Sequence, residues 1–292
     1  MRDGDSKMAF LDFFYKNKAG RIILRPLISR PVSELSGRLL DHRASRLLIG
    51  PFVNRYDIDL NDYQLDDINC FNDFFCRRIK NGLRPVDCNE NHLIAPSDGL
   101  LSVYSITEDL ILSIKQSRFT VSRLLKDKNL ASLFDGGYAL VFRLCVDHYH
   151  RYVYFDSGKK YRDRRIKGVY HTVRPVALGE YPVFAENTRE YSVIDSEGFG
   201  RAVQMEVGAM LVGRIVNDCP AAGWIKRGEE KGHFEYGGST IILLLSKDRV
   251  VLRQDLQDIL DTNTEIPVVL GESLGDGVSG PLVRNERAMN AQ

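Results

Sequence analysis

The sequence predicts an α+β fold, in which an N-terminal helical region packs on a β-rich body. Apolar residues recur at near-helical spacing through residues 6–80, and from Leu93 onward they gather in short strand-like runs. The hydrophobic content of 43% over 292 residues is enough for one large core or two modest ones. We therefore expect a helical region over residues 1–80, a β-rich domain over 81–275 and a loose polar tail over 276–292.

The helical region is basic and divided into short amphipathic helices. Phe10, Phe13 and Phe14 open the helical pattern, and glycines and prolines interrupt it. Residues 16–55 contain nine Lys or Arg and only two acidic residues, whereas the whole chain has a net charge of +1. This asymmetry indicates an anionic partner, and the overall balance argues against extended nucleic-acid binding. An anionic phospholipid surface is the better candidate, although a basic solvated helix face gives the same pattern.

The β-rich domain is read from four apolar runs and two helical exceptions. The runs are residues 100–104, 139–146, 203–216 and 236–245. Residues 121–126 and 255–260 have helical patterns.

The cysteines and the lack of long apolar segments bear on location. The five cysteines are odd in number and contain no Cys-x-x-Cys pair, and no signal peptide precedes them, so a reducing cytoplasm is expected. No apolar run approaches the roughly 20 residues that a spanning helix needs. Any contact with the membrane is therefore expected to be peripheral.

The segment Gly237–Thr240 carries the strongest chemical signal, because it directly precedes the apolar run Ile241–Leu245. A serine hydroxyl that reaches the preceding carbonyl can move the acyl group from nitrogen to oxygen, and the ester can then eliminate to leave a pyruvoyl group. Glycine at 238 leaves the attacked carbonyl unshielded. Gly-Gly-Ser also forms ordinary turns, so this segment alone does not decide the function.

Three further segments place ionisable groups beside strand-like runs. Asp98 precedes Gly99 in a pattern that also forms simple turns. His148 and His150 lie two residues apart, so on a strand they face one side and can bind a metal, orient a carboxylate or transfer protons. His171 begins a third such segment. Together with Ser239 these residues suit an acid–base–nucleophile relay, although structural histidines are common.

Beyond these residues, the chain resembles the bacterial phosphatidylserine decarboxylase family over most of its length. The order and spacing of its motifs are highly specific. They are Phe71-Asn72-Asp73-Phe74-Phe75 with Arg77, Arg84-Pro85, Pro96-x-Asp98-Gly99, Tyr149-His150-Arg151, Thr172-Val173-x-Pro175, Asn187-x-Arg189-Glu190-Tyr191, Glu206-Val207-Gly208-Ala209 with Val212-Gly213, Lys226-x-Gly228-Glu229-x-x-Gly232-x-Phe234, and Gly238-Ser239-Thr240.

The resemblance implies a proenzyme with a sandwich- or barrel-like body that cuts itself between Gly238 and Ser239. A β chain of residues 1–238 and an α chain of residues 239–292 would result, with Ser239 converted to the pyruvoyl cofactor. Asp98 and Ser239 match two members of an Asp-His-Ser relay. The pyruvoyl group would form a Schiff base with phosphatidylserine, and His150 is the candidate donor of the proton that replaces CO₂ to give phosphatidylethanolamine. The resemblance also implies a homodimer. We expect the protein to lie peripherally on the cytoplasmic side of the cell membrane and to need no metal.

The chain departs from the family pattern where a second histidine usually follows Tyr-His-Arg, because Val153 stands there. We hypothesise that His171 replaces this histidine as the base for self-cleavage, with His148 and His150 as alternatives. Gln116 is a smaller departure, at a position where glycine commonly follows lysine.

Three other functions stay open at this point. A pyruvoyl enzyme can also decarboxylate a free amino acid, because the chemistry needs only an amine beside a carboxylate. His148 and His150 suit a metal-dependent β-barrel enzyme. A non-enzymatic membrane-binding module is the third alternative, which Val153 favours and Asp98, Gly238 and Ser239 oppose.

Overall fold

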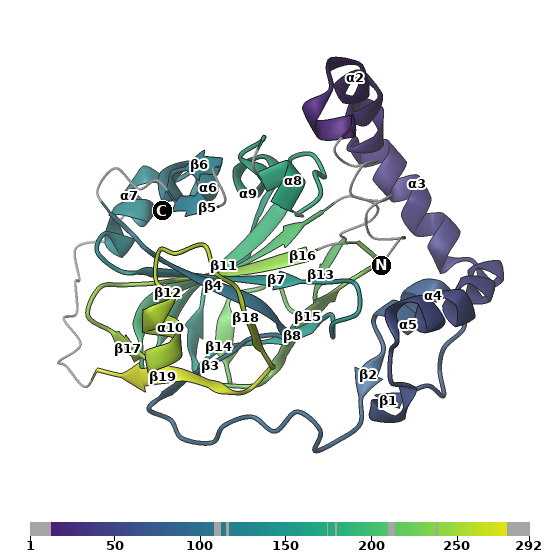
Figure 1. Cartoon of the computed structure of the whole chain (residues 1–292). Helices are drawn as coiled ribbons and strands as arrows, with labels where there is room; N and C mark the ends of the chain where they lie inside the picture. The colour runs from purple at the N-terminus through teal and green to yellow at the C-terminus, as the bar shows by residue number, and fades with distance from the viewer. Residues whose placement is uncertain are drawn as a thin grey trace.

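The architecture, seen in a computed structural model, is α+β as predicted (Figure 1). The structure describes residues 13–107, 112–114, 117–173, 175–178, 180–209, 214–237 and 239–278. Gly238, Gln116 and residues 279–292 therefore lie outside the described residues, as do Phe10 and Val212-Gly213.

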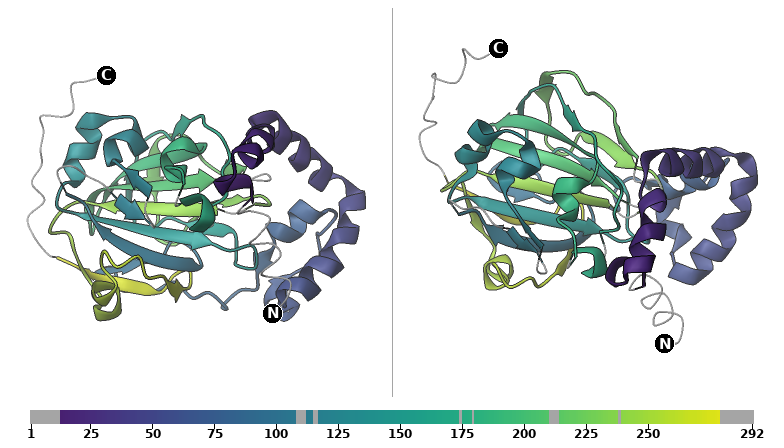
Figure 2. Two further views of the ribbon diagram at one scale, coloured as in Figure 1. Left: turned by 45° about the horizontal axis from the view of Figure 1, so that its top comes forward. Right: turned by 90° about the horizontal axis from the view of Figure 1, so that it is seen from above.

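Short helices make up most of the described N-terminal part of the chain. They are α2 (Lys18–Leu27), α3 (Arg30–Asp41), the 3-10 helix η1 (Arg43–Leu48), α4 (Ile49–Tyr56), the 3-10 helix η2 (Leu60–Asp62) and α5 (Phe71–Phe75). Their starts follow local sequence signals: the Asn17 side chain caps α2, and Cys70 with Asp73 forms a capping box at α5. Figures 1 and 2 show α2 and α3 projecting beside the sheets rather than lying across them.

A nine-stranded antiparallel sheet is the centre of the molecule. Its order is β14 (Gly223–Ile225), β9 (Gly158–Lys160), β11 (Arg189–Ser196), β12 (Gly200–Gly208), β16 (Ser239–Leu245), β7 (Tyr138–Leu144), β4 (Gly99–Ser105) and β18 (Ile266–Val268), and β10 (Arg164–Ile166) pairs with β11. β16 lies between β12 and β7 and is buried along its whole length, which explains its unbroken apolar sequence.

Alternation along the strands divides the core into two layers. Ile242 and Leu244 of β16 face a helical layer formed by α6 (Val121–Leu125), α7 (Lys128–Ala131), α8 (Pro175–Leu178) and α9 (Val183–Glu186). Ile241 and Leu243 face the opposite side, where two three-stranded sheets cover them. These are β13 (Ile215–Asn217), β15 (Glu230–Phe234) and β8 (Arg151–Val153), and β17 (Val250–Leu252), β19 (Ser273–Gly277) and β3 (His92–Ile94). We call the space between the nine-stranded sheet and these smaller sheets the inter-sheet layer.

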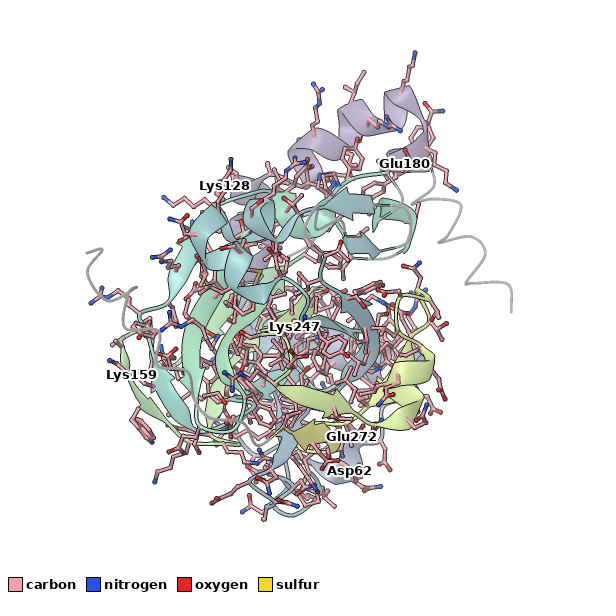
Figure 3. The ribbon with its side chains drawn as sticks, turned by 90° about the vertical axis from the view of Figure 1, so that its left-hand side faces the viewer. Asp62, Lys128, Lys159, Glu180, Lys247 and Glu272 are labelled. Carbon is pink, nitrogen blue, oxygen red and sulfur yellow. The ribbon has the colours of Figure 1, made fainter. Side chains whose placement is uncertain are left out.

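The two sides of the sheet can be compared in Figure 3, where Lys128 and Glu180 mark the helical side and Asp62 and Glu272 the other. The remaining elements are the hairpin β5 (Leu112–Ile114) and β6 (Ser117–Phe119), the pair β1 (Tyr63–Gln64) and β2 (Arg78–Ile79), the 3-10 helix η3 (Ser132–Phe134) and α10 (Gln254–Asp258).

An aromatic cluster joins the N-terminal helices to the segment that precedes β16. Phe52 of α4 packs against Phe71 and Phe75 of α5, and all three rings contact Tyr236. The helical region therefore packs against Tyr236, which is only three residues before Ser239.

Two expectations about elements need correction. The run 203–216 was expected to be one strand, but β12 ends at Gly208 and β13 begins at Ile215 in a different sheet. The tail was expected to begin at residue 276, but β19 continues to Gly277 because it pairs with β17. The strands of the described residues form stacked open sheets and no closed barrel, in agreement with the predicted α+β fold. No described helix is long and apolar enough to cross a bilayer.

Candidate active site

Ser239 is the first residue of the central strand β16. It pairs with Gly208 of β12 on one side and with Leu144 of β7 on the other. Its side chain is 0% exposed, and its hydroxyl oxygen has no hydrogen-bond partner. A buried hydroxyl without a partner is costly, and such groups concentrate where chemistry needs them. Ser239 has the same alternation as Ile241 and Leu243, so its hydroxyl points into the inter-sheet layer.

Asp98 lies at the same end of the sheet as Ser239. Leu100 pairs with Arg143 and Val268 pairs with Gly99, so the Asp98–Gly99 turn is level with the Leu144–Ser239 pair. A Cβ atom at residue 99 would lie about 3.3 Å from the Arg143 carbonyl oxygen, which is a tight contact that favours glycine.

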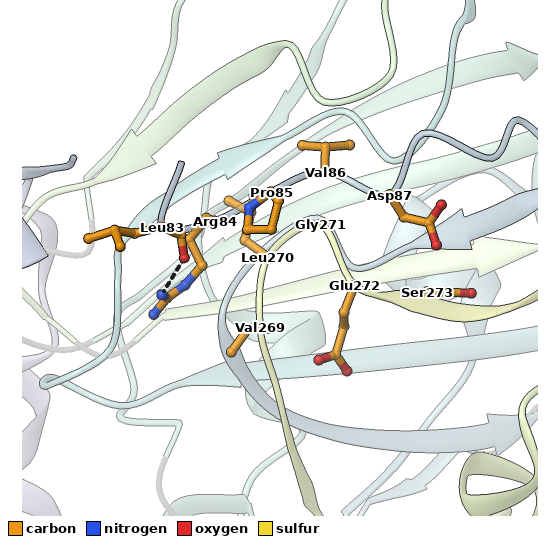
Figure 4. Close-up of a pocket in the computed structure, with 10 residues that line it drawn as sticks. All are labelled: Leu83, Arg84, Pro85, Val86, Asp87, Val269, Leu270, Gly271, Glu272 and Ser273. Carbon is orange, nitrogen blue, oxygen red and sulfur yellow. Dashed lines mark hydrogen bonds between the residues drawn. The ribbon is translucent and has the colours of Figure 1, made fainter. Parts of the chain in front are cut away.

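Two groups hold the Asp98 carboxylate. The Arg84 guanidinium donates to both of its oxygens, with N–O distances of 2.9 to 3.3 Å, and the Leu270 backbone N–H donates to Oδ1 at 2.8 Å. The carboxylate is only 10% exposed, and these contacts stabilise its charge. The hydrogen bond to Asp98 also raises the pKa of Arg84. Arg84 and Leu270 also line an open groove of about 370 Å³ between residues 83–87 and 269–273 (Figure 4). Because both residues hydrogen-bond to Asp98, the groove lies beside this carboxylate.

His150 points into the inter-sheet layer that also receives Ser239. The His150 carbonyl accepts from the Phe234 N–H, and this bond continues the β8–β15 ladder. The His150 side chain is therefore on the same face of β8 as that of Tyr152, which lies in the core. The ring packs on Phe75 with centroids 4.1 Å apart.

The hydrogen bonds of His150 define its tautomer. Nδ1 lies 2.9 Å from the His148 carbonyl, and because a carbonyl only accepts, Nδ1 carries the proton. Nε2 is then an acceptor, and it is buried without a partner. Burial lowers the pKa of His150 to about 3, so the ring is neutral at neutral pH and its Nε2 carries a free lone pair.

His148 belongs to the turn between β7 and β8 and has a different environment. Its Nδ1 accepts from the Cys145 N–H at 3.2 Å, so Nε2 carries the proton of the neutral ring. Burial lowers the pKa of His148, while the charges of Asp147 and Asp98 oppose this shift. Among the described residues, the group with metal-ligand spacing is Cys145, Asp147 and His148, and His150 is not part of it.

Comparison with known proteins identifies the family. The model of the phosphatidylserine decarboxylase family matches residues 71–276. The chain is 40% identical over 268 residues to phosphatidylserine decarboxylase proenzyme 2 of Clostridium acetobutylicum, which covers 91% of each chain. It is 38% identical over 271 residues to the proenzyme of Ruminiclostridium cellulolyticum, covering 91% of this chain and 90% of the relative. The proenzyme of Clostridium perfringens is 34% identical over 274 residues, covering 92% and 93%.

The chain belongs to the phosphatidylserine decarboxylase family. In this family member, Val153 occupies the position expected to hold a second histidine. Its side chain packs with Ile94, Tyr149 and Leu270, on the side of β8 opposite to Tyr152. The position is therefore apolar and faces away from the layer that contains the Ser239 hydroxyl.

His171, the hypothesised replacement, lies in this decarboxylase family member on the other side of the nine-stranded sheet. It lies in the loop before α8. Its ring stacks on Tyr181 at 4.6 Å and contacts Tyr15, which belongs to the helical layer. Nε2 lies 3.6 Å from Glu186, and burial lowers the pKa of the ring to about 4. The structure thus brings together Asp98, His148, His150 and Ser239 at one end of the sheet, and it does not bring His171 to the same face.

Sequence reasoning assigned no role to Glu206 and Lys231, which form a fully buried ion pair in the inter-sheet layer. Glu206 is a named residue of one motif of the phosphatidylserine decarboxylase family. Lys231 lies at an unspecified position of another motif, between Glu229 and Gly232. A charged residue within an otherwise apolar strand, as Glu206 is between Met205 and Val207, was the available signal.

Proposed function

We propose that this protein is a proenzyme that cuts itself between Gly238 and Ser239 and then decarboxylates phosphatidylserine. The observation that supports this most is the Ser239 hydroxyl, which is fully buried, lacks a hydrogen-bond partner and begins a central strand on the face of the sheet toward which His150 also points. A structural serine in this position would be expected to have a partner.

The proposed cleavage balances as follows. The Ser239 oxygen adds to the Gly238 carbonyl carbon, the C–N bond breaks, and the Ser239 nitrogen gains a proton in place of the one lost from oxygen. Loss of the Ser239 α-proton then breaks the Cβ–Oγ bond, and Gly238 leaves as a carboxylate. Water replaces the nitrogen, ammonia is released, and a pyruvoyl ketone blocks residue 239. This ketone supplies the carbonyl that accepts the substrate amine and withdraws electrons as CO₂ leaves.

His150 is the best-placed base for the first step. Its neutral ring presents an unpartnered Nε2 in the layer into which the Ser239 hydroxyl points, and its tautomer is held by the His148 carbonyl. His148, whose pKa is influenced by Asp98, is the second candidate. His171 is the third, because its ring packs on the other face of the sheet.

In the mature enzyme, His150 is proposed to donate the proton that replaces CO₂. Burial keeps this ring neutral in the proenzyme, so it must first take up a proton. The negative charge of a bound phosphate-bearing substrate favours the protonated form of a neighbouring imidazole. Asp98, held by Arg84, is proposed to stabilise positive charge on the histidines of this site.

The exposed faces of the N-terminal helices support contact with a lipid surface. Leu35 and Leu39 are one turn apart on α3 and are 57% and 64% exposed, and Leu47 of η1 is 83% exposed. Arg38 and Arg46 are exposed on the same elements. Apolar and basic side chains together suit peripheral binding to anionic phospholipid, and we place this contact on the cytoplasmic side of the membrane.

Denaturing mass spectrometry of the purified chain tests the proposal. We expect two fragments, residues 1–238 and 239–292, with the second carrying a ketone in place of its amino terminus, and a single intact chain for Ser239→Ala. Release of phosphatidylethanolamine from phosphatidylserine vesicles, without release of CO₂ from free serine, then tests the substrate. A wild-type chain that stays intact in the presence of such vesicles would overturn the proposal.

A further inference from the structure

The inter-sheet layer contains a buried ion pair that the proposed chemistry has not used. Lys231 Nζ lies 2.5 Å from Glu206 Oε2, and both side chains are 0% exposed. Replacing such a pair with apolar residues is often neutral or stabilising, because the cost of removing both charges from water offsets their attraction. Stability alone therefore does not explain why two charges are kept here.

A β-bulge directs Lys231 toward Glu206. The pairing of β15 with β8 is regular at Gly232, which is opposite Tyr152, and shifts between Gly232 and Glu230. Because Tyr152 faces the core, regular alternation would turn Lys231 outward. The extra residue instead aims it inward, and bulges of this kind are common beside active sites.

Glu206 is a near neighbour of Ser239 on the same face of the sheet. Gly208 pairs with Ser239, and Glu206 pairs with Ile241, so Glu206 and Ser239 are diagonal neighbours across β12 and β16. Side chains in this relation start about 7–8 Å apart, within reach of long side chains.

One oxygen of Glu206 has no partner. Oε2 accepts from Lys231, and the Asn217 amide lies 3.4 Å away, whereas Oε1 is buried without a hydrogen bond. Burial raises the pKa of Glu206 to about 7, with the Lys231 charge opposing the shift. A carboxylate with this pKa is suited to both accepting and returning a proton near neutral pH.

The groups around the pair come from several elements. Asn217 of β13 contacts Glu206 and accepts from the Tyr152 hydroxyl at 2.9 Å. The same amide lies 3.2 Å from Glu190 and 3.4 Å from Asp163. Two further carboxylates therefore face the pair, and Lys231 is the cation that contacts Glu206.

We propose that Glu206 is a proton-transfer residue of the site at residue 239, taking up through Oε1 a proton lost from Ser239 during self-cleavage, and that Lys231 is the positioning residue that orients its carboxylate. This rests on the proposed function. In the chemistry above, Ser239 loses its hydroxyl proton and then its α-proton, so a second acceptor beside His150 has a use. The proton passes from Glu206 to water as the carboxylate is regenerated.

The test compares self-cleavage rates by denaturing mass spectrometry in the full chain. Glu206→Gln keeps the size and loses the proton-accepting carboxylate, and we expect cleavage slowed by about 10² or more. The double variant Glu206→Gln/Lys231→Met also removes the buried ammonium, so it keeps the fold free of an unpaired charge and is expected to be equally slow. The control is Arg227→Met/Asp156→Asn, which removes an ion pair 3.7 Å apart whose side chains are 10% and 5% exposed. Asp156 contacts Ser196 and Gly198, so this pair lies at the end of β11 and β12 away from Ser239. This control is expected to cleave at the wild-type rate.

The outcomes separate the two proposals. A wild-type chain that never cleaves overturns the proposed function and this inference with it. A wild-type chain that cleaves, together with a double variant that cleaves equally fast, overturns the inference alone, because a purely structural pair would give that result. Slow cleavage in a double variant whose thermal unfolding matches wild type supports the inference.

Discussion

Acidification from pH 8 to pH 5 is expected to destabilise the folded chain, because it holds two buried histidines, His150 and His171, and a half-buried one, His233, in the neutral form. Burial lowers the pKa of His150 to about 3 and the pKa values of His171 and His233 to about 4. Each ordinary imidazole titrates near pH 6.5, so below that pH the unfolded chain binds protons that the folded chain does not. The free energy of unfolding must therefore fall as pH decreases through this window, and continue to fall until the folded-state pKa is reached.

The size of the effect follows from these pKa values. At pH 5 each of the three histidines costs about 2 kcal/mol relative to pH 8, or about 6 kcal/mol together. Glu206 acts in the opposite direction: burial raises its pKa to about 7, so the folded chain binds a proton more tightly than the unfolded one. It returns roughly 2 to 3 kcal/mol, which leaves a net loss of about 3 to 4 kcal/mol. That is a large part of the roughly 5–15 kcal/mol that stabilises a typical domain.

Urea unfolding of Ser239→Ala, which the proposed cleavage would leave as one intact chain, measures this loss at pH 8, 6 and 5. His233→Gln in the same background is the informative variant, because it removes one titrating group outside the proposed chemistry. We expect its pH-dependent loss to be smaller by about 2 kcal/mol. A loss below about 1 kcal/mol in the parent, unchanged by His233→Gln, would refute the reasoning, since it would mean that the imidazoles take up protons inside the folded chain.

Three further predictions concern the site and the helices. Arg84→Met removes the cation that holds Asp98 and is expected to cost about 2 kcal/mol in urea unfolding and to leave uncut proenzyme by mass, with Arg84→Lys intermediate because it keeps the charge without the bidentate geometry. Val153→His places an imidazole in an apolar cluster, so it is expected to destabilise by about 2 kcal/mol without speeding self-cleavage; faster cleavage would contradict the facing assigned to this position. Leu35→Ser/Leu39→Ser is expected to weaken sedimentation with phosphatidylserine vesicles by about tenfold or more at an unchanged unfolding temperature, because both side chains are exposed.

Local periodicity predicted the elements whose surroundings agree with their own pattern. The helices at α6 and α10 and the strands β4, β7 and β16 were found within one to three residues of the predicted ends. The run 203–216 was not resolved into β12 and β13, because an apolar run records burial and does not record which sheet buries it. The caps at Asn17 and Cys70 show that the start of a helix depends on nearby residues. The sheet to which a strand belongs depends on residues far away in the sequence.

The sequence predicted which residues form the site, but it did not predict which side of the sheet each side chain faces. Asp98, His150 and Ser239 were named from motifs, and the register places their segments at one end of the sheet. His171 is hypothesised to replace the histidine missing at Val153, yet its ring packs in the helical layer. The direction of the His171 side chain could not be predicted, because His171 lies in a loop and has no strand alternation that would define its face.

Lys231 shows why alternation alone misleads at such a site. Counting outward from Tyr152 and its partner Gly232 puts this lysine on the outer side of β15, where a charged residue needs no explanation. The single extra residue of the bulge reverses that assignment and buries the ammonium against Glu206, beside the strand that begins at Ser239. A lysine that alternation places on the outer side of a strand therefore gives no sign of a buried site until the register is known. Once the register is known, its burial against Glu206 supports the proposal that the layer beneath Ser239 serves proton transfer as well as packing.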